Sequence, residues 1–243
     1  MDIIICNDAK EFNEKSAQIL ASQIQQKLNS ILGLATGSTP VGMYRQLIEM
    51  YKNNQLDFEQ VKTFNLDEYV GLDKDHPQSY HAFMFKNLFD HINIKKENVH
   101  LPDGKASDLE GECAAYEEKI KKAGGIDLQV LGVGHNGHIG FNEPKTPFES
   151  TTHVVELDQR TIEANSRFFD SIDEVPRKAL SMGIKTIMQA KKILFMAIGA
   201  DKAEIVAKAL QGPVTPDVPA SVLQLHPNVT VVLDKEAASK LSL

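Results

Sequence analysis

Apolar and polar residues follow two different periods along the chain, and the change from one period to the other predicts a series of strands and helices. Short runs of β-branched and aliphatic residues, such as 31–35, are typical of buried strands, and apolar residues every three or four positions, as in 12–28, are typical of amphipathic helices. Asn7 or Asp8 is expected to cap the first helix. Strands are expected at residues 2–6, 31–35, 61–66, 126–133, 192–198 and 229–233, and helices at 12–28, 41–51, 79–89, 108–122 and 202–210.

Because strands and helices alternate throughout, the pattern predicts an α/β fold, a doubly wound and mainly parallel sheet with helices on both faces. A chain of 243 residues is of a length that commonly forms one α/β domain, so residues 1–243 are expected to form a single domain. Residues 212–219 contain three prolines and are expected to form a loop rather than a domain boundary.

Composition and charge exclude several classes of partner. The chain carries 26 Lys and Arg against 33 Asp and Glu, a net charge of −7, and no basic cluster, which argues against nucleic acid binding. Asp2 stands where a signal peptide needs a cation, and no apolar run approaches the ~20 residues of a membrane span, so a cytoplasmic protein is expected. Cys6 and Cys113 lack metal-type spacing and are expected to be buried thiols.

The richest chemistry follows the fourth predicted strand, in the glycine-rich residues 131–144. Residues at the carboxyl end of a strand in an open α/β sheet face the crevice where ligands bind. This placement makes Asn136, His138 and Glu143 candidates for catalysis, because an imidazole exchanges protons near neutral pH and a neighbouring carboxylate can orient it. His135 is equally well explained as a solvated loop histidine.

Two other interpretations of the same segment are weaker. Residues 132–137 satisfy the dinucleotide-binding pattern G-x-G-x-x-G, but the following residues contain two prolines and do not continue into the helix that this motif needs. A metal bound by His135, His138 and Glu143 lacks a clear further ligand nearby, and a glycine-rich loop fixes ligands poorly. Acid–base chemistry is therefore the favoured interpretation.

Residues 36–40, of sequence Thr-Gly-Ser-Thr-Pro, lie between a predicted strand and a predicted helix. Backbone amides around Gly37, the hydroxyls of Ser38 and Thr39, and a helix N-terminus together favour a bound phosphate. An ordinary helix cap is the alternative, since small polar residues are common before helices. No Gly-Lys-Ser/Thr follows, so ATP is not implied.

Single charged residues elsewhere supply further candidates. Asp67 and Glu68 follow the third predicted strand, where a partly desolvated carboxylate can transfer protons, although a solvated turn is the more frequent role of an acid there. Arg167 and Lys202 are cations that can pair with a phosphate, Lys202 from the first turn of a predicted helix. Either cation can also be an ordinary surface charge.

Taken together, these motifs resemble the glucosamine-6-phosphate deaminase family. The segment Gly-His-Ile-Gly-Phe-Asn-Glu-Pro at 137–144 is highly specific to that family, whereas the phosphate loop is shared in outline with the related 6-phosphogluconolactonases. The resemblance spans nearly the whole chain and is carried by residues 36–40, 64–71, 132–144, 165–170 and 223–227.

The resemblance implies a doubly wound α/β fold and the conversion of glucosamine 6-phosphate and water to fructose 6-phosphate and ammonia, without a metal ion or an organic cofactor. Asp67 would be the base that moves a proton between C2 and C1 of the opened sugar. His138 would assist ring opening, with Asn136 and Glu143 holding it. The phosphate contacts of the family match Gly37, Ser38, Thr39, Arg167 and Lys202.

The chain departs from the family pattern at two places. Many members have Asp where this chain has Asn136, so His138 has one carboxylate fewer beside it, and a modified rather than lost ring-opening step is expected. In the longer, allosterically activated members, basic residues after the Asn-Glu-Pro motif bind an activator. Those positions correspond here to His153 and Val155, so no such activation is expected.

Two alternative functions are a 6-phosphogluconolactonase and a non-enzymatic sugar-phosphate sensor. Asp67 and Glu143 in their full motifs argue against the lactonase. The sensor would need a DNA-binding module, and the residues before the second strand form only one strand and one helix. The sequence leaves the choice between a monomer and a homo-oligomer open.

Overall fold

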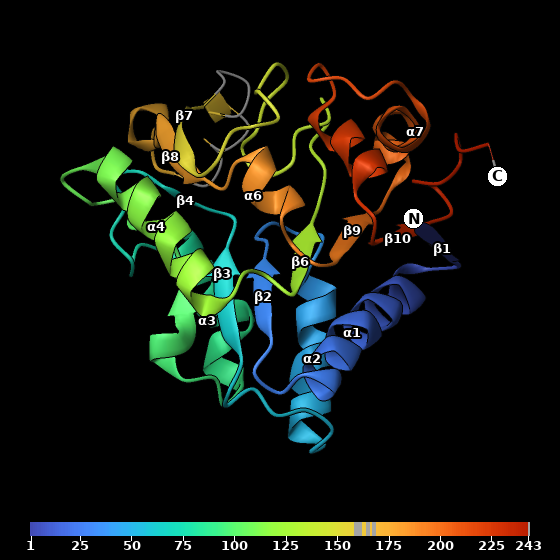
Figure 1. Ribbon diagram of the computed structural model, residues 1–243, viewed down its shortest axis with the longest axis horizontal. Coiled ribbons are helices and arrows are strands. Elements are labelled where there is room, and N and C mark those ends of the chain that lie inside the picture. The colour runs from blue at the N-terminus through green and yellow to red at the C-terminus, as the bar shows by residue number, and fades with distance from the viewer. Residues whose placement is uncertain (158–161, 164–165, 167–168, 243) are drawn as a thin grey trace.

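The protein is built around a parallel sheet of seven strands in the order β1-β10-β9-β6-β2-β3-β5 (Figure 1). The computed structural model describes residues 1–157, 162–163, 166 and 169–242. The single α/β domain with a mainly parallel sheet agrees with the sequence prediction. In sheet order the strands are β1 (Asp2–Cys6), β10 (Val229–Asp234), β9 (Ile193–Ala197), β6 (Leu128–Leu131), β2 (Ile31–Leu34), β3 (Lys62–Asn65) and β5 (Val99–His100).

Helices cover both faces of this sheet. Right-handed crossovers between parallel strands place α1, α2 and α3 on one face and α4 and α7 on the other, and α1 packs against α2 (Figure 1). The α-helices are α1 (Ala9–Gln26), α2 (Val41–Lys52), α3 (Tyr80–Asn87), α4 (Leu109–Ala123), α6 (Ile184–Met188) and α7 (Ala203–Gln211). Short 3₁₀ helices are η1 (Phe89–His91), η2 (Lys96–Asn98), η3 (Ile172–Glu174), η4 (Ala200–Lys202) and η5 (Pro219–Leu225).

Local chemistry sets the ends of these elements. Asp8 begins α1 by accepting a hydrogen bond from the amide of Glu11 at 2.8 Å, so the helix starts three residues earlier than the apolar period predicts. Gly124 ends α4 with a φ of 103°, a left-handed conformation that favours glycine. The strand predicted over residues 126–133 is shorter, since β6 ends at Leu131, directly before Gly132.

A second, antiparallel sheet of three strands was not predicted from the sequence. It contains β4 (Asp67–Tyr69), β8 (Lys178–Ser181) and β7 (His153–Glu156) in the order β4-β8-β7. Asp67 pairs with Ser181, so this sheet joins residues that are more than a hundred positions apart in the chain. The sheet lies at one end of the molecule and completes the site described below (Figure 1).

The order of strands reverses between β2 and β6. From β2 the sheet continues through β3 to β5, and from β6 it continues through β9 to β10 in the opposite direction. In an open α/β sheet, the carboxyl ends of the strands on either side of such a reversal form a crevice in which ligands bind. The loops that follow β2 and β6 therefore meet at the expected place for a site.

The opposite, amino-terminal edge of β6 carries a fully paired carboxylate. Asp127 is 3% exposed, and its oxygens accept hydrogen bonds from Nζ of Lys27 at 2.6 Å, Nζ of Lys191 at 2.7 Å and the amide of Ile31 at 2.8 Å. Burial would raise the pKa of Asp127, but the bonds from Lys191, Lys27 and Ile31 outweigh it and lower that pKa. This cluster joins α1, β2 and β6 and has a structural role.

Two further expectations concern the thiols and the membrane. Cys6 and Cys113 are both free and buried, as predicted. Within the described part of the chain, none of the helices combines the length and the apolar character that a membrane crossing requires.

Candidate active site

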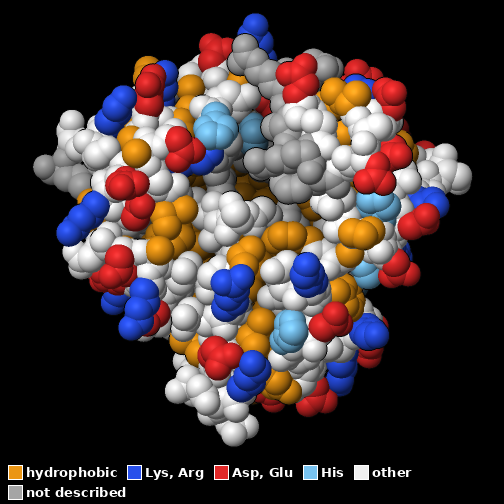
Figure 2. Space-filling view, turned by 180° about the vertical axis from the view of Figure 1, so that it is seen from behind, with side chains coloured by type: hydrophobic (Ala, Val, Ile, Leu, Met, Phe, Trp, Pro, Cys, Tyr) orange, Lys and Arg blue, Asp and Glu red, His pale blue; other side chains and the backbone are white. Residues whose placement is uncertain are grey.

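A cavity of about 650 Å³ opens at the carboxyl edge of the sheet, where the loops after β2 and β6 meet β4 and the start of α3. Seen from behind, the surface of the molecule is hollowed near its centre, with hydrophobic side chains inside the hollow (Figure 2). The sequence candidates that line the cavity are Gly37, Ser38, Thr39, Asp67 and His138. These candidates come from three separate segments of the chain and line one cavity.

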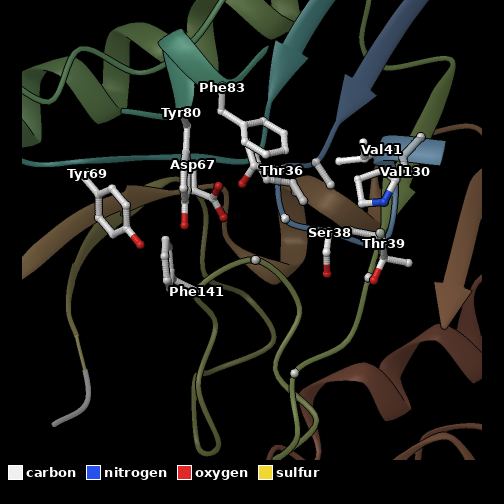
Figure 3. Close-up of a pocket in the computed structure, with 18 of the residues that line it drawn as sticks. Thr36, Ser38, Thr39, Val41, Asp67, Tyr69, Tyr80, Phe83, Val130 and Phe141 are labelled. Atoms are coloured by element: carbon white, nitrogen blue, oxygen red, sulfur yellow. The ribbon is translucent and has the colours of Figure 1, made fainter. Parts of the chain in front are cut away.

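The loop at residues 36–40 leads directly into α2. Gly37 has a φ of 90°, which turns the chain in a conformation that other residues rarely adopt. Pro40 occupies the cap position of α2 and no side chain caps the helix. The amide of Val41 donates to the carbonyl of Ser38 at 3.3 Å, so the amides of Gly42 and Met43 are the ones left for a ligand. The side chains of Ser38 and Thr39 lie at the same wall of the cavity (Figure 3). A helix N-terminus flanked by hydroxyls suits an anion.

Asp67 lies on β4 with its carboxyl group at the cavity wall, beside Tyr80 (Figure 3). It is 7% exposed and, unlike Asp127, has no cation among its perturbing neighbours. Burial, together with the negative charge of Glu68, raises the pKa of Asp67 to about 8. A carboxylate whose pKa lies near neutral pH is suited to taking a proton from a substrate and returning it.

His138 and Glu143 lie together, and His138 lines the same cavity as Asp67. Nδ1 of His138 is 3.2 Å from Oε1 of Glu143, close enough for an ion pair although the ring is not aligned for a linear hydrogen bond. Asn136 donates from Nδ2 to Oε2 of Glu143 at 2.5 Å, and its Oδ1 accepts the amide of His138 at 3.2 Å. Burial would raise the pKa of Glu143, but its contacts with His138 and Asn136 lower it. The three predicted residues therefore form one cluster, in which His138 alone lines the cavity.

Gly134 is required by the position of the imidazole. A Cβ atom on Gly134 would lie 2.1 Å from Cε1 of His138, so only glycine lets the ring pack on the backbone there. Further along, the amide of Phe141 donates to Oγ of Ser181 at 3.0 Å, and Asn142 donates from Nδ2 to the carbonyl of Met182 at 2.8 Å. These bonds fix the loop against β8, the strand that pairs with β4.

The predicted cations are not part of the described cavity wall. Lys202 is at the end of η4, with 17% of its side chain exposed and Nζ 3.9 Å from Asp201, and burial lowers its pKa against the opposing charge of Asp201. It is not one of the residues that line the cavity. Arg167 lies outside the described residues. His135 is 77% exposed, which agrees with a solvated loop histidine.

An aromatic wall beside Asp67 was missed by the sequence reasoning. The rings of Tyr69 and Tyr80 are 4.6 Å apart, and Tyr80 stacks on Phe141 at 6.2 Å (Figure 3). The hydroxyl of Tyr80 forms hydrogen bonds with Tyr69 and with Thr36 of the phosphate loop. The predicted helix at residues 79–89 indicated where Tyr80 lies along the chain, but only the three-dimensional fold brings its first turn to the cavity.

Among the residues that the structure describes, no three His, Cys, Asp or Glu side chains converge so that they could hold a metal ion. This finding includes the surroundings of His135, His138 and Glu143.

Comparison with known proteins identifies close relatives. The family model for glucosamine-6-phosphate isomerases/6-phosphogluconolactonase matches residues 7–232. The glucosamine-6-phosphate deaminase of Thermoanaerobacter pseudethanolicus (strain ATCC 33223 / 39E) is 61% identical over 239 residues, which cover 98% of this chain and 94% of the relative. That of Clostridium botulinum (strain Kyoto / Type A2) is 57% identical over 243 residues, covering both chains completely.

Solved structures separate into a near and a distant group. A monomeric glucosamine-6-phosphate deaminase matches with a TM-score of 0.96 at 49% identity, covering 99% of this chain and 100% of that one. The 6-phosphogluconolactonase of Thermotoga maritima matches with a TM-score of 0.76 at 19% identity, covering 96% of this chain and 98% of that one. The second similarity shows a shared fold and nothing more.

Proposed function

The chain belongs to the family of glucosamine-6-phosphate isomerases and 6-phosphogluconolactonases, and on this basis we propose that it is a glucosamine-6-phosphate deaminase. It would convert glucosamine 6-phosphate and water to fructose 6-phosphate and ammonia, a step of amino-sugar catabolism. Identity of 55–61% to deaminases along the chain, against 19% to the lactonase of Thermotoga maritima, supports this branch of the family.

The observation that carries the proposal is the unpaired, buried carboxylate of Asp67 in a cavity that also receives the N-terminus of α2. Aldose–ketose isomerisation needs a base that takes a proton from one carbon and returns it to the next. A pKa of about 8 suits Asp67 to both directions of this transfer. An anion anchor at residues 37–39 would fix the sugar relative to the base by its phosphate.

The proposed reaction begins with the closed sugar. His138, held by Glu143 and Asn136, would exchange protons with the ring oxygen and the C1 hydroxyl and so open the pyranose. Asp67 would then take the proton from C2, leaving an enolamine, and return it to C1. The nitrogen remains on C2 as an imine, and water adds there to release ammonia and the C2 ketone. Arg167 and Lys202 are proposed as further phosphate contacts.

The proposed enzyme is a monomer without allosteric activation. His153 and Val155, both on β7, stand where activated family members have basic residues, so N-acetylglucosamine 6-phosphate is expected to leave the saturation curve hyperbolic and unchanged. Sigmoidal curves that sharpen with this compound would contradict the expectation. The structural relative at 49% identity is a monomeric enzyme, which supports a monomer here. We place the enzyme in the cytoplasm, because phosphorylated sugars are retained inside cells by their charge.

The decisive experiment measures ammonia and fructose 6-phosphate released from glucosamine 6-phosphate by purified, chelator-treated protein. Equal release of both products is expected. Hydrolysis of 6-phosphogluconolactone, assayed in parallel, is expected to be absent. Lactone hydrolysis without ammonia release would replace the proposal with a lactonase, and saturable binding of the sugar phosphate without turnover would indicate a sensor.

A further inference from the structure

Glu68, the neighbour of Asp67 on β4, is a buried acid to which the proposed reaction assigns no role. It is 5% exposed, and consecutive strand residues point to opposite faces, so Glu68 turns away from the cavity that Asp67 lines. Its side chain borders a second cavity of about 610 Å³ instead. The two carboxylates therefore stand back to back in the wall between two cavities.

The oxygens of Glu68 accept hydrogen bonds from backbone amides alone. Oε1 accepts from Tyr69 at 2.8 Å and from Tyr80 at 2.9 Å, and Oε2 accepts from His81 at 2.8 Å. The amides of Tyr80 and His81 belong to the first turn of α3, which a helix cannot satisfy internally. One carboxylate thus joins the strand that holds Asp67 to the helix that carries Tyr80.

This joint determines the geometry of the cavity wall. Ser79, Tyr80 and Phe83 of the α3 region line the cavity, and the hydroxyl of Tyr80 reaches Thr36 of the phosphate loop. Ser79 caps α3 by accepting the amide of Ala82 at 3.0 Å, so the helix would persist without Glu68. The distinct contribution of Glu68 is to fix where α3 lies relative to β4.

The charge of Glu68 also acts on Asp67. Burial, opposed by the amides of Tyr80, His81 and Tyr69, raises the pKa of Glu68, and its negative charge contributes to the raised pKa of Asp67. The other titratable groups close enough to Asp67 to feel its charge are the hydroxyls of Tyr69, Tyr80 and Tyr116, and His138 lines the same cavity. The groups on the far side of Glu68, around the second cavity, are Asp73, Lys74, Asp75, His81, His100, Asp103, Lys105, Glu112 and Lys119.

We propose that Glu68 is a positioning residue for proton transfer by Asp67: it holds β4 against the first turn of α3 and keeps a negative charge behind the reacting carboxylate. The inference rests on the proposed deaminase reaction. Glu68 would not touch the substrate, since its oxygens are bound to backbone amides on the opposite face of the strand.

The test compares wild type with Glu68→Gln and Glu68→Asp. Glu68→Gln removes the charge, so the pH midpoint of kcat/KM is expected to fall by roughly 0.5–1 unit, with kcat roughly tenfold lower and KM changed less than about threefold. Glu68→Asp keeps the charge but withdraws the oxygens from α3. It is expected to retain the wild-type midpoint, while amide hydrogen exchange at Tyr80 and His81 becomes faster.

Asp108→Asn is the matched control. Asp108 caps α4 by accepting the amide of Gly111 at 2.9 Å, so this change also removes a carboxylate from a helix N-terminus, but Asp108 does not line the cavity. It is expected to lower thermal stability and leave the pH midpoint in place. A Glu68→Gln enzyme with the wild-type midpoint would overturn the proposal, because a merely structural role lowers kcat without moving the pH profile.

A readout that does not depend on turnover keeps this inference separate from the proposed function. The carboxyl carbon of Asp67 is titrated by NMR in wild type and in Glu68→Gln, with its signal assigned by its loss in Asp67→Asn. A lower pKa in Glu68→Gln supports the role of Glu68, and an unchanged value overturns it. Absence of ammonia release by wild type would refute the deaminase and leave the titration to decide the role of Glu68.

Discussion

Asp127 and Asp67 are nearly equally buried, but their pKa values are shifted in opposite directions. Asp127, 3% exposed, is held by two lysines and an amide, and these partners lower its pKa below the usual value although burial acts in the other direction. Asp67, 7% exposed, has a second carboxylate as its charged neighbour, and burial together with that charge raises its pKa to about 8. Burial is therefore not what distinguishes a structural carboxylate from a reactive one.

What distinguishes them is the partners that the fold supplies. At the amino edge of β6 the partners are complete, so ionised Asp127 stabilises the folded state. At the opposite edge of the sheet, burial and the charge of Glu68 favour the neutral form of Asp67 and bring its pKa to about 8, so its two protonation states differ little in free energy near neutral pH. A buried acid that has no cationic partner and lies at the carboxyl edge of an α/β sheet is therefore a candidate for proton transfer.

The largest expected effect is on turnover. Asp67→Asn removes the base but keeps the shape of the side chain, so kcat is expected to fall by about a thousandfold or more with the fold intact. Steady-state ammonia release and circular dichroism measure the two quantities. Near-normal activity in the variant would remove Asp67 from the mechanism.

Asp127→Asn should show the opposite behaviour. The change leaves Lys27 and Lys191 facing a neutral amide, and the free energy of unfolding is expected to fall by about 3 kcal/mol. Activity per folded molecule is expected to stay at the wild-type level, since Asp127 lies at the far edge of the sheet from the cavity. Denaturant titration measures the free energy of unfolding, and kcat at low temperature measures the activity of the folded enzyme. A loss of kcat without a loss of stability would contradict the structural role of Asp127.

The pH dependence of stability should differ in sign between the two residues. The raised pKa of Asp67 favours folding below its unfolded pKa, and this contribution is lost as the pH rises from about 4 to about 8. Relative to wild type, the free energy of unfolding of Asp67→Asn should therefore rise by roughly 3–4 kcal/mol between pH 5 and pH 8. The lowered pKa of Asp127 gives a contribution that is present above its unfolded pKa and lost as the pH falls below about 4. Urea unfolding across this range would show whether the two trends are opposed.

The smallest expected effect is that of Asn136→Asp. Asn136 is the neutral partner of Glu143, a half-buried acid. Asn136→Asp replaces the donor beside Glu143 with a second carboxylate. We expect kcat and kcat/KM to change by less than about tenfold, because Glu143 and His138 remain in place. Parallel kinetics of the two enzymes measure the difference. A loss of about a hundredfold or more would mean that Asn136 has a role of its own in ring opening.

Local patterns predicted most of the helices and strands, because the spacing of apolar residues within each segment determines its secondary structure. The strand at residues 2–6 is confirmed as β1, and the remaining predicted strands and helices occur with shifted ends. The sheet β4-β8-β7 escaped prediction because its strands have only three or four residues. β4 pairs with β8 across more than a hundred positions, and no tight hairpin turn marks the pairing of β7 with β8.

The part of the candidate site that lies in one loop was predictable from the sequence. The part that depends on contacts between distant segments was not. The cluster of Asn136, His138 and Glu143 comes from one loop, and the sequence suffices to indicate it. Asp67, which Glu68 follows, and Asp127 look alike in the sequence, as acids beside apolar runs. The lysines that distinguish them, Lys27 and Lys191, are distant along the chain, and so no local pattern reveals which acid is paired.

The pairing of β1 with β10 constrains the order in which the molecule can be completed during synthesis. Asp2 lies opposite Thr230, and β1 is an edge strand whose neighbour in the sheet is β10. β1 thus leaves the ribosome long before β10, the strand with which it pairs, has been translated. At the usual ~5–20 residues per second this interval is on the order of tens of seconds. During that time the segment lacks the sheet neighbour that covers it in the folded protein, and an unpaired strand edge is a template for pairing with other chains.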